Sequence, residues 1–260
     1  MPEGDTIHHA ARRIGAVLAG HVPDEIVTPH PRFARDRWPE RLAGRELEAA
    51  EAVGKHLLLR FGGGLLIHSH LRMSGSWRVL RRGERRRSTR SVWLVLGHGD
   101  YEVVQLNGPV LELMTAARVR SDPRLTRLGP DIVAPGPFDE TRFLRRLRED
   151  DPTRTLGDSL LDQHIVAGIG NFWKSEACWL AGIDPWRQLR SVADEEALAV
   201  IRAARPLMQQ SAVTGRQDQF KTIYGRDRAP CPRCGAPHLV RARGQGDDVR
   251  VTYWCAECQR

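Results

Sequence analysis

Apolar residues recur at helical spacing near the beginning of the chain. They are Ile7, Ala10, Ala11, Ile14, Val17 and Leu18, and Gly20 follows as a helix stop. A repeat of three to four residues places such side chains on one face of an α-helix. The pattern predicts a helix over residues 7–18, with Glu3 at or just before its N-terminus.

Between about residue 24 and residue 114 the apolar positions form short runs separated by turn residues. The runs are residues 57–61, 65–68, 76–80, 92–96, 101–106 and 110–113. Glycine-containing segments at 62–64 and 97–100 are typical of hairpin turns. Several short strands at close spacing predict an antiparallel sandwich or barrel.

The pattern changes again after residues 121–137, where four prolines predict a linker. Helical patterns follow at residues 139–148, 158–165 and 171–180, and a capping-box-like start at 191–194 predicts a fourth helix. Pro206 is expected to kink that helix or to end it early. No internal repeats or low-complexity tracts are present.

The charge balance indicates a polyanion as partner. Lys and Arg number 40 against 32 Asp and Glu, which gives a net charge of +8 and a pI near 9.8. Basic side chains at phosphates release counterions, although a basic soluble protein rich in arginine is the alternative interpretation. No apolar run approaches the roughly 18 residues that cross a bilayer. The acidic, polar N-terminus is also unlike a signal peptide, so we expect a cytoplasmic protein without membrane contact.

Four of the five cysteines form two Cys-x-x-Cys pairs, Cys231 with Cys234 and Cys255 with Cys258. Four thiolates at this spacing predict a tetrahedral zinc site, with cytosolic disulfides as the alternative. The segment between the pairs contains Arg241, Arg243 and Arg250. It therefore favours a β-hairpin finger that contacts nucleic acid over a purely structural zinc ribbon. Cys178 is expected to be a small buried side chain.

The first residues carry candidate chemistry. If Met1 is removed, Pro2 presents a secondary amine, which can attack an electrophilic carbon and form an iminium. Glu3, one residue away, can supply or withdraw a proton. Taken alone, these residues also suit an ordinary solvated chain end.

Three internal segments are further candidates. Gly168-Ile169-Gly170-Asn171 opens a predicted helix, where backbone N–H groups can bind phosphate, although this motif alone is a weak signal. Lys55 follows Gly54 at the start of a strand, and a loop over residues 70–75 places an apolar residue among polar ones. The basic run from Arg81 to Arg90 is either a solvated loop or a phosphate contact.

The order of these signals along the chain resembles the bacterial formamidopyrimidine-DNA glycosylase and endonuclease VIII family. Further matches are Leu128-Gly129-Pro130-Asp131, Leu161-Asp162-Gln163, Ala181-Gly182-Ile183-Asp184-Pro185 and Tyr224-Gly225-Arg226. The resemblance runs from residue 2 to residue 259. It implies an α+β multidomain fold with an N-terminal antiparallel β-sandwich and N-terminal helix, a helix–two-turn–helix domain and a β-hairpin zinc finger. The expected domains are residues 1–120, a linker over 121–137, residues 138–222 and residues 223–260.

The resemblance also implies a base-excision-repair enzyme that is both a DNA glycosylase and an abasic-site lyase. Pro2 would attack the sugar C1′ of a damaged nucleotide, and Glu3 would protonate the sugar ring oxygen. Lys55 would contact phosphate and assist proton transfer, and β- then δ-elimination would cut the strand. The resemblance further implies damaged double-stranded DNA as the partner and one structural zinc ion as the cofactor. It implies a monomer in the bacterial cytoplasm, associated with the nucleoid.

The implied DNA contacts come from several segments. Arg250, in the finger, and Asn171 would bind phosphates beside the lesion, and Arg72, Tyr224 and Arg226 would add further contacts. A flipped nucleotide leaves a gap that needs a plug, and we assign this role to Met73, with a plain core position as the alternative.

Within the family, the opening Glu-Gly-Asp-Thr resembles endonuclease VIII, which implies oxidised pyrimidines as substrates. The short segment 211–224 leaves little room for the loop that caps 8-oxoguanine in the other branch, and Gln105-Leu106-Asn107-Gly108-Pro109 lacks the Arg and Phe which that branch inserts beside the orphaned base. The loop over residues 70–75 instead resembles the formamidopyrimidine branch, so an 8-oxoguanine-type glycosylase stays open. A non-enzymatic binder of damaged DNA and an enzyme restricted to abasic sites stay open as well.

Overall fold

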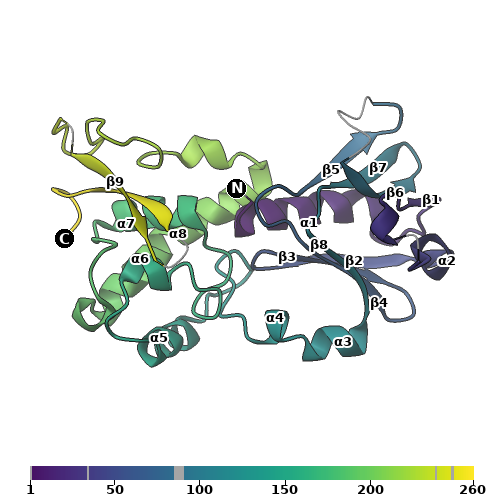
Figure 1. Ribbon diagram of the computed structural model, residues 1–260, viewed down its shortest axis with the longest axis horizontal. Coiled ribbons are helices and arrows are strands. Elements are labelled where there is room, and N and C mark those ends of the chain that lie inside the picture. Colours follow the sequence, from purple (N-terminus) through teal and green to yellow (C-terminus); the bar gives the residue numbers. More distant parts are fainter. Residues whose placement is uncertain (1, 34, 85–90, 238, 247–248) are drawn as a thin grey trace. The chain divides into compact units, whose positions relative to one another are not determined.

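The computed structural model describes residues 2–33, 35–84, 91–237, 239–246 and 249–260, which form two compact units (Figure 1). The first unit consists of Pro2 with Thr6–Thr126, and the second of Glu3–Asp5 with Arg127–Arg260. Helix α1 spans Gly4–Leu18, so its first residues group with the second unit and the rest with the first. The helix predicted over residues 7–18 is confirmed.

The first unit contains two antiparallel sheets of four strands each. One sheet has the order β1–β6–β7–β5, formed by Glu25–Val27, Val92–His98, Tyr101–Leu106 and Ser76–Arg81. The other has the order β2–β3–β4–β8, formed by Leu47–Val53, His56–Phe61, Leu65–His70 and Val110–Thr115. Ile14 of α1 shares one apolar core with Leu59 and Leu96 of the two sheets. The predicted β-sandwich with an N-terminal helix is confirmed.

Short helices complete the first unit. They are η1 (Pro31–Phe33), α2 (Trp38–Leu42), α3 (Ala116–Ser121) and α4 (Pro123–Thr126). Val119 of α3 packs with Leu58 and Met114 in a second, smaller cluster. Because strand residues alternate between faces, this cluster covers the face of the β2–β3–β4–β8 sheet opposite the main core. Helix α4 occupies part of the predicted linker.

The second unit is helical. Its elements are α5 (Glu140–Glu149), α6 (Leu156–Ser159), α7 (Asn171–Ala181), η2 (Leu189–Ser191), α8 (Asp194–Thr214) and η3 (Gln217–Phe220). Leu147, Val166, Trp173 and Ile201 belong to its core. The helices are followed by a hairpin of β9 (Val240–Gln245) and β10 (Arg250–Cys255), which carries Val240 and Cys255 against Trp179.

One helix prediction was wrong. The helix predicted over 158–165 ends at Ser159, and turns follow. There Asp162 Oδ1 accepts a hydrogen bond from His164 N, and the Gln163 side chain bonds the backbone of Leu161, Gly168 and Ile169. Such side-chain bonds compete with the helix ladder. Helix α8 continues past Pro206 to Thr214, which excludes an early end there, and a kink at Pro206 stays a prediction.

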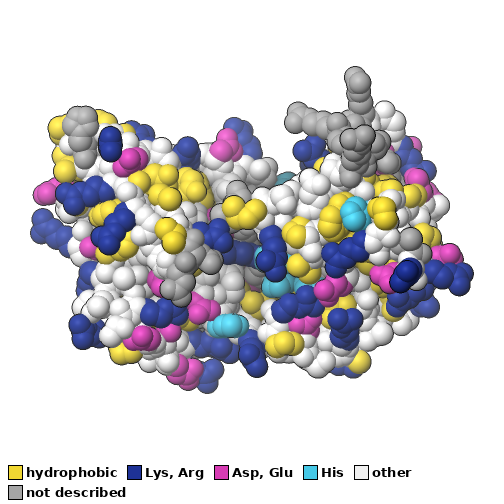
Figure 2. Space-filling model, viewed as in Figure 1, with side chains coloured by type: hydrophobic (Ala, Val, Ile, Leu, Met, Phe, Trp, Pro, Cys, Tyr) yellow, Lys and Arg dark blue, Asp and Glu magenta, His cyan; other side chains and the backbone are white. Residues whose placement is uncertain are grey.

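Charged side chains are spread over the visible surface of both units, where Lys and Arg alternate with Asp and Glu (Figure 2). This distribution is consistent with the net charge of +8. None of the helices in the described part of the chain is long and apolar enough to cross a membrane.

Candidate active site

Glu3 is the most constrained residue of the N-terminal segment. Its side chain is buried, and its carboxylate accepts hydrogen bonds from the backbone N–H groups of Gly170, Phe172 and Trp173 at 2.9, 2.8 and 3.3 Å. Helix α7 has no side-chain cap of its own at Gly170. Glu3 therefore caps this helix from a distant part of the sequence, and the positive end of the helix dipole stabilises its negative charge.

Two glycines make this close approach possible. A Cβ on Gly170 would lie 2.3 Å from Glu3 Cδ, and a Cβ on Gly4 would lie 2.7 Å from Gly168 Cα. Gly4 N also donates to Gly168 O at 2.9 Å, where Gly168 has a φ of +104°. The Gly-x-Gly motif therefore packs directly against residues 3 and 4 of the N-terminal segment. The motif was expected to bind phosphate through its N–H groups, but the N–H of Gly170 already donates to Glu3 and that of Gly168 to Gln163 Oε1.

Asp5 adds a third anchor that sequence reasoning missed. It is fully buried, and its carboxylate accepts hydrogen bonds from Ser211 Oγ at 2.5 Å and Gln217 Nε2 at 3.1 Å. Its only sequence signal was its place in the Glu-Gly-Asp-Thr opening. Residues 3–5 are thus fixed one after another, which restricts the backbone that carries Pro2. Within the first unit, Pro2 lines a cavity of about 250 Å³ together with Thr6, Leu71 and others.

Lys55 lies at the tip of the β2–β3 hairpin. Val53 pairs with His56, so Gly54 and Lys55 form a two-residue turn in which Gly54 has a φ of +56°. Glycine at the first turn position suits the twist of a hairpin. Lys55 also influences His70 on the neighbouring strand, because burial first and then the Lys55 charge lower the pKa of His70 to about 4.

The loop after β4 presents the other predicted DNA-contacting residues of the first unit. Arg72 has a φ of +47° and its N–H donates to His70 Nδ1 at 3.2 Å. Met73 is 62% exposed, which excludes the alternative that it is a plain core residue. Gly75 N donates to Leu71 O at 3.0 Å and closes the loop. A large apolar side chain is therefore displayed on a tight turn.

Helix α7 and strand β10 are joined along their length, which positions Arg250 at the start of β10. Asn171 Nδ2 donates to Val251 O at 2.7 Å, and Ser175 Oγ accepts from Tyr253 N at 3.3 Å. Asn171 Oδ1 is buried without a hydrogen-bond partner among the described residues. One amide N–H of the predicted phosphate ligand is therefore used to hold the hairpin.

Between these two contacts, Lys174 hydrogen-bonds Thr252, and Thr252 donates to Gln245 Oε1 at 2.6 Å. Lys174 is fully buried, and burial lowers its pKa to about 8. Sequence reasoning missed this group, because a lysine in a helical pattern is normally a solvent-exposed residue.

Glu176 fixes the segment that precedes the cysteines. Its Oε1 accepts the backbone N–H groups of Thr222, Ile223 and Tyr224 at 3.0, 3.0 and 2.8 Å. Burial raises the pKa of Glu176, and these three hydrogen bonds oppose the shift. Tyr224 packs between Phe172 and Tyr253, whereas Arg226 is exposed.

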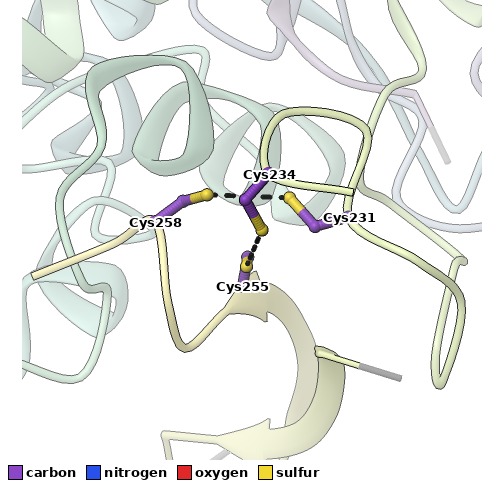
Figure 3. Close-up of side chains that lie close together, drawn as sticks. All are labelled: Cys231, Cys234, Cys255 and Cys258. Carbon is purple, nitrogen blue, oxygen red and sulfur yellow. Dashed lines mark hydrogen bonds between the residues drawn. The ribbon is translucent and has the colours of Figure 1, made fainter. Parts of the chain in front are cut away.

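The four cysteines of the two Cys-x-x-Cys pairs meet in space (Figure 3). Their sulfur atoms all lie within 4.8 Å of one another, with Cys231–Cys258 at 3.8 Å and Cys234–Cys255 at 3.9 Å. A disulfide requires about 2.05 Å, so that alternative is excluded. With Zn–S bonds of about 2.3 Å, sulfurs at neighbouring corners of a tetrahedron lie about 3.8 Å apart, so the cluster fits such an ion. Cys178 is buried apart from them, as expected.

The predicted site residues therefore fall into groups. In the first unit, Lys55 and Arg72 lie near His70, with Met73 on the same loop. In the second, Asn171 is the first residue of α7, and Tyr224 and the finger that carries Arg250 contact this helix. The start of α7 also binds Glu3. The basic run begins at Arg81, the last residue of β5. Because residues 85–90 lie outside the described residues, the contact of this run with phosphate stays a prediction.

Two protein-family models match the sequence of this chain. The profile described as the formamidopyrimidine-DNA glycosylase N-terminal domain matches residues 1–107, and that of the formamidopyrimidine-DNA glycosylase H2TH domain matches residues 128–222. The class defined by fold and site is therefore a β-sandwich joined to a helix–two-turn–helix domain.

The similarity to other proteins extends over the whole chain. A probable endonuclease 8 2 of Streptomyces coelicolor is 39% identical over 100% of this chain and 94% of that protein. The DNA-(apurinic or apyrimidinic site) lyase Nei2 of Mycolicibacterium smegmatis is 33% identical over 100% and 99%. The formamidopyrimidine-DNA glycosylase of Lactococcus lactis, solved with DNA containing an abasic site, shares the fold with a TM-score of 0.83 at 23% identity, over 100% of both chains. The chain belongs to the formamidopyrimidine-DNA glycosylase and endonuclease 8 family.

Proposed function

We propose that the chain is a base-excision-repair DNA glycosylase and abasic-site lyase that removes oxidised bases through Pro2. The proposal rests on the three hydrogen bonds that the Glu3 carboxylate accepts from backbone N–H groups at the start of α7. These hydrogen bonds hold the residue next to Pro2 in one place, as a nucleophile paired with a proton-transfer group requires.

The chemistry begins once Met1 is removed. The Pro2 nitrogen attacks C1′, the bond from C1′ to the base breaks, and the base leaves with the bonding electrons. Pro2 loses its N–H proton, the sugar ring opens as its oxygen receives a proton, and an iminium joins Pro2 to C1′. Glu3, whose carboxyl group is held one residue from the nucleophile, transfers this proton.

Strand cleavage follows from the iminium. Loss of a proton from C2′ expels the 3′ phosphate, and a second elimination expels the 5′ phosphate. Lys55 contacts phosphate and assists these proton transfers, and Arg250, Asn171, Arg72, Tyr224 and Arg226 bind the DNA around the lesion. A base inside the duplex is out of reach, so the nucleotide is flipped and the exposed Met73 fills the gap.

The substrate class we assign is oxidised pyrimidines in double-stranded DNA. The full-length relatives named endonuclease 8 support this branch. The chain between α8 and Tyr224 supports it as well, because the segment after Thr214 is short and η3 occupies residues 217–220 of it. We further propose that the protein acts as a monomer at the nucleoid and that the four cysteines bind one structural zinc ion.

Borohydride trapping on DNA with a single abasic site tests the proposal. Reduction converts the iminium into a stable covalent complex, which should form with the processed protein. The complex should be lost in Pro2→Gly and in a protein with extra N-terminal residues. Absence of an adduct for the processed wild type across the pH range would leave a non-enzymatic DNA binder.

A lesion panel separates the two branches of the family from a pure lyase. Release of thymine glycol or 5-hydroxycytosine in preference to 8-oxoguanine is expected. Preference for 8-oxoguanine would place the chain in the other branch, and cleavage of abasic DNA without release of any base would restrict it to lyase activity.

A further inference from the structure

Three histidines lie together on one face of the β2–β3–β4–β8 sheet, beside Lys55. In the strand register His56 is opposite His70, and His68 is opposite Glu112. His68 and His70 are two residues apart on β4, so all four side chains point to the same face. Farther along the same strands, this face is apolar and packs against α3.

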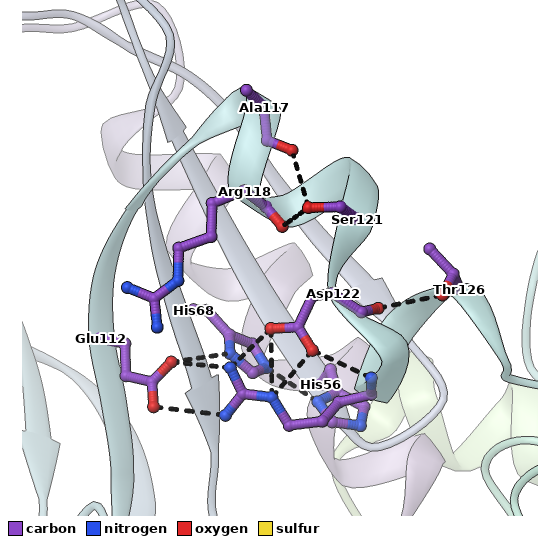
Figure 4. A network of polar contacts seen from close by, with 9 residues as sticks. His56, His68, Glu112, Ala117, Arg118, Ser121, Asp122 and Thr126 are labelled. Atoms are coloured by element: carbon purple, nitrogen blue, oxygen red, sulfur yellow. Dashed lines mark hydrogen bonds and ion pairs between the residues drawn. The ribbon is translucent and has the colours of Figure 1, made fainter.

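The polar end of this face is a continuous chain of contacts (Figure 4). His56 Nδ1 and His68 Nε2 are 2.8 Å apart, and both rings are buried. His68 Nδ1 faces Glu112 Oε2 at 3.9 Å. The Arg124 guanidinium donates to both Glu112 oxygens, at 3.2 and 2.7 Å, and to Asp122 at 2.6 Å. We call the series Arg124–Glu112–His68–His56 the histidine chain.

Glu112 is a charged neighbour of the histidines. Hydrogen bonds from Arg124 lower the pKa of Glu112, so the carboxylate only accepts. His56 Nδ1 and His68 Nε2 share a hydrogen bond in which either ring can be the donor, whereas His68 Nδ1 has no hydrogen-bond partner among the described residues. The His56 ring also packs against His70, with ring centres 4.8 Å apart, and His70 is the ring on which the Lys55 charge acts. The histidine chain therefore reaches the neighbourhood of Lys55 through His70.

The histidines are neutral at physiological pH. Burial lowers the pKa of His56 to about 3 and that of His68 and His70 to about 4. Arg124 acts in the same direction on all three rings, Lys55 and Arg72 act on His70, and Asp122 opposes the shift at His56 and His68. In the described part of the chain, the cysteine cluster is the only group of three or more potential ligands that could hold a metal ion. The rings therefore contribute neither charge nor metal ligation, but a packed and hydrogen-bonded support beside the turn that carries Lys55.

Apolar residues would fill this face at lower desolvation cost, as Leu58 and Met114 do farther along. The polar side chains begin only where the strands reach the turn that carries Lys55. Lysine is a flexible point charge, so a rigid support beside its turn limits where its ammonium group can lie.

Resting on the proposed function, we propose that His56 and His68 are positioning residues that orient Lys55 for its contact with the DNA. The histidine chain transmits the fixed position of the Arg124–Glu112 pair to the Lys55 turn. This role is separate from the nucleophile and from Glu3.

His68→Leu and His68→Gln test the proposal, because Gln can retain a hydrogen bond with His56 and Leu cannot. Single-turnover cleavage of abasic DNA should fall about tenfold or more in His68→Leu at saturating DNA and recover in His68→Gln. In a Lys55→Ala background, His68→Leu should cause no further loss, because both changes act through one side chain. Additive losses, or a wild-type rate in His68→Leu, would overturn the proposal. His98→Leu, on the other sheet, is the matched control and should keep the wild-type rate.

A second measurement does not depend on catalysis. Reductive methylation followed by mass spectrometry gives the reactivity of Lys55 as a function of pH. The Lys55 profile should change in His68→Leu and in Glu112→Gln, and other lysines should keep theirs. Identical profiles would refute the proposal even in a protein that cannot be trapped. Glu112→Gln also serves if His68→Leu fails to fold. Failure of wild-type trapping alone would instead refute the proposed function.

Discussion

The Gly170→Ala substitution tests whether Glu3 and the start of α7 form one unit. A Cβ at this position would lie 2.3 Å from Glu3 Cδ and 2.5 Å from Oε1, closer than real Cβ atoms approach other atoms. The backbone of Gly170, with a φ of −124°, is extended and open to any residue. Alanine therefore adds no backbone strain, and its whole effect is to displace the Glu3 carboxylate.

The magnitude follows from the groups left behind. The displaced carboxylate would abandon the N–H groups of Gly170, Phe172 and Trp173. One buried polar group without a partner costs about 1–3 kcal/mol, and three that share one acceptor do not add independently. We expect a loss of about 3 kcal/mol, or roughly 6–12 °C in the melting temperature of a chain of this size. A displacement of about 1 Å at the reacting groups should slow trapping about a hundredfold.

Thermal unfolding and borohydride trapping of the same preparations measure both effects. Gly15→Ala in α1 is the matched control, because its Cβ would meet only Ala50 Cβ at 3.8 Å. Removing a glycine from a helix interior should raise stability by about 0.5–1 kcal/mol and leave trapping unchanged. If Gly170→Ala melted and reacted like the wild type, the contact between Glu3 and α7 would not position the reaction centre.

Three further predictions concern the second unit. Chelation of zinc, or Cys255→Ser, should abolish DNA binding in a gel-shift assay while circular dichroism still shows the helices; normal cleavage after chelation would make the finger dispensable. Arg250→Ala should weaken DNA binding and reduce the slope of log K against log salt by about one, and an unchanged slope would exclude a phosphate contact. Because the pKa of Lys174 is lowered in the folded protein to about 8 from 10.5, the native state releases this proton first as pH rises. The free energy of unfolding should therefore gain a rising contribution between pH 8 and 10.5, which Lys174→Met should remove in pH-dependent denaturation experiments.

The local patterns of the sequence predicted the elements of the fold well where one face is buried. The spacing of Ile7, Ala11 and Ile14 identifies α1, and the short apolar runs identify the strands of the sandwich. The cysteine pairs identify their own cluster, because thiolates at this spacing have few possible arrangements. The helix expected over 158–165 failed because Asp162 and Gln163 bond nearby backbone groups instead of solvent.

Contacts between distant parts of the chain are not encoded in any local period. Glu3 and Gly170 are 167 positions apart, and Asp5 and Ser211 are 206 apart. Their sequence signals are a short acidic opening and two glycines, which are common in loops. The burial of Lys174 depends in the same way on β10 folding back onto α7. Such side chains are interpreted as solvated until the tertiary structure supplies their partners.

Substitutions of Glu3 cannot separate the capping of α7 from the proposed proton transfer. Because Glu3 caps α7 and also adjoins Pro2, any substitution of Glu3 changes helix capping and proton transfer together, so loss of activity in Glu3→Gln does not by itself prove a catalytic role. Pro2 lacks this ambiguity, since its side chain lies in the first unit and none of the hydrogen bonds that cap α7 comes from it. Pro2→Gly should therefore keep the melting temperature of the wild type while it loses the covalent complex. The same separation applies to retention of Met1, which blocks the amine and leaves the Glu3 contact in place.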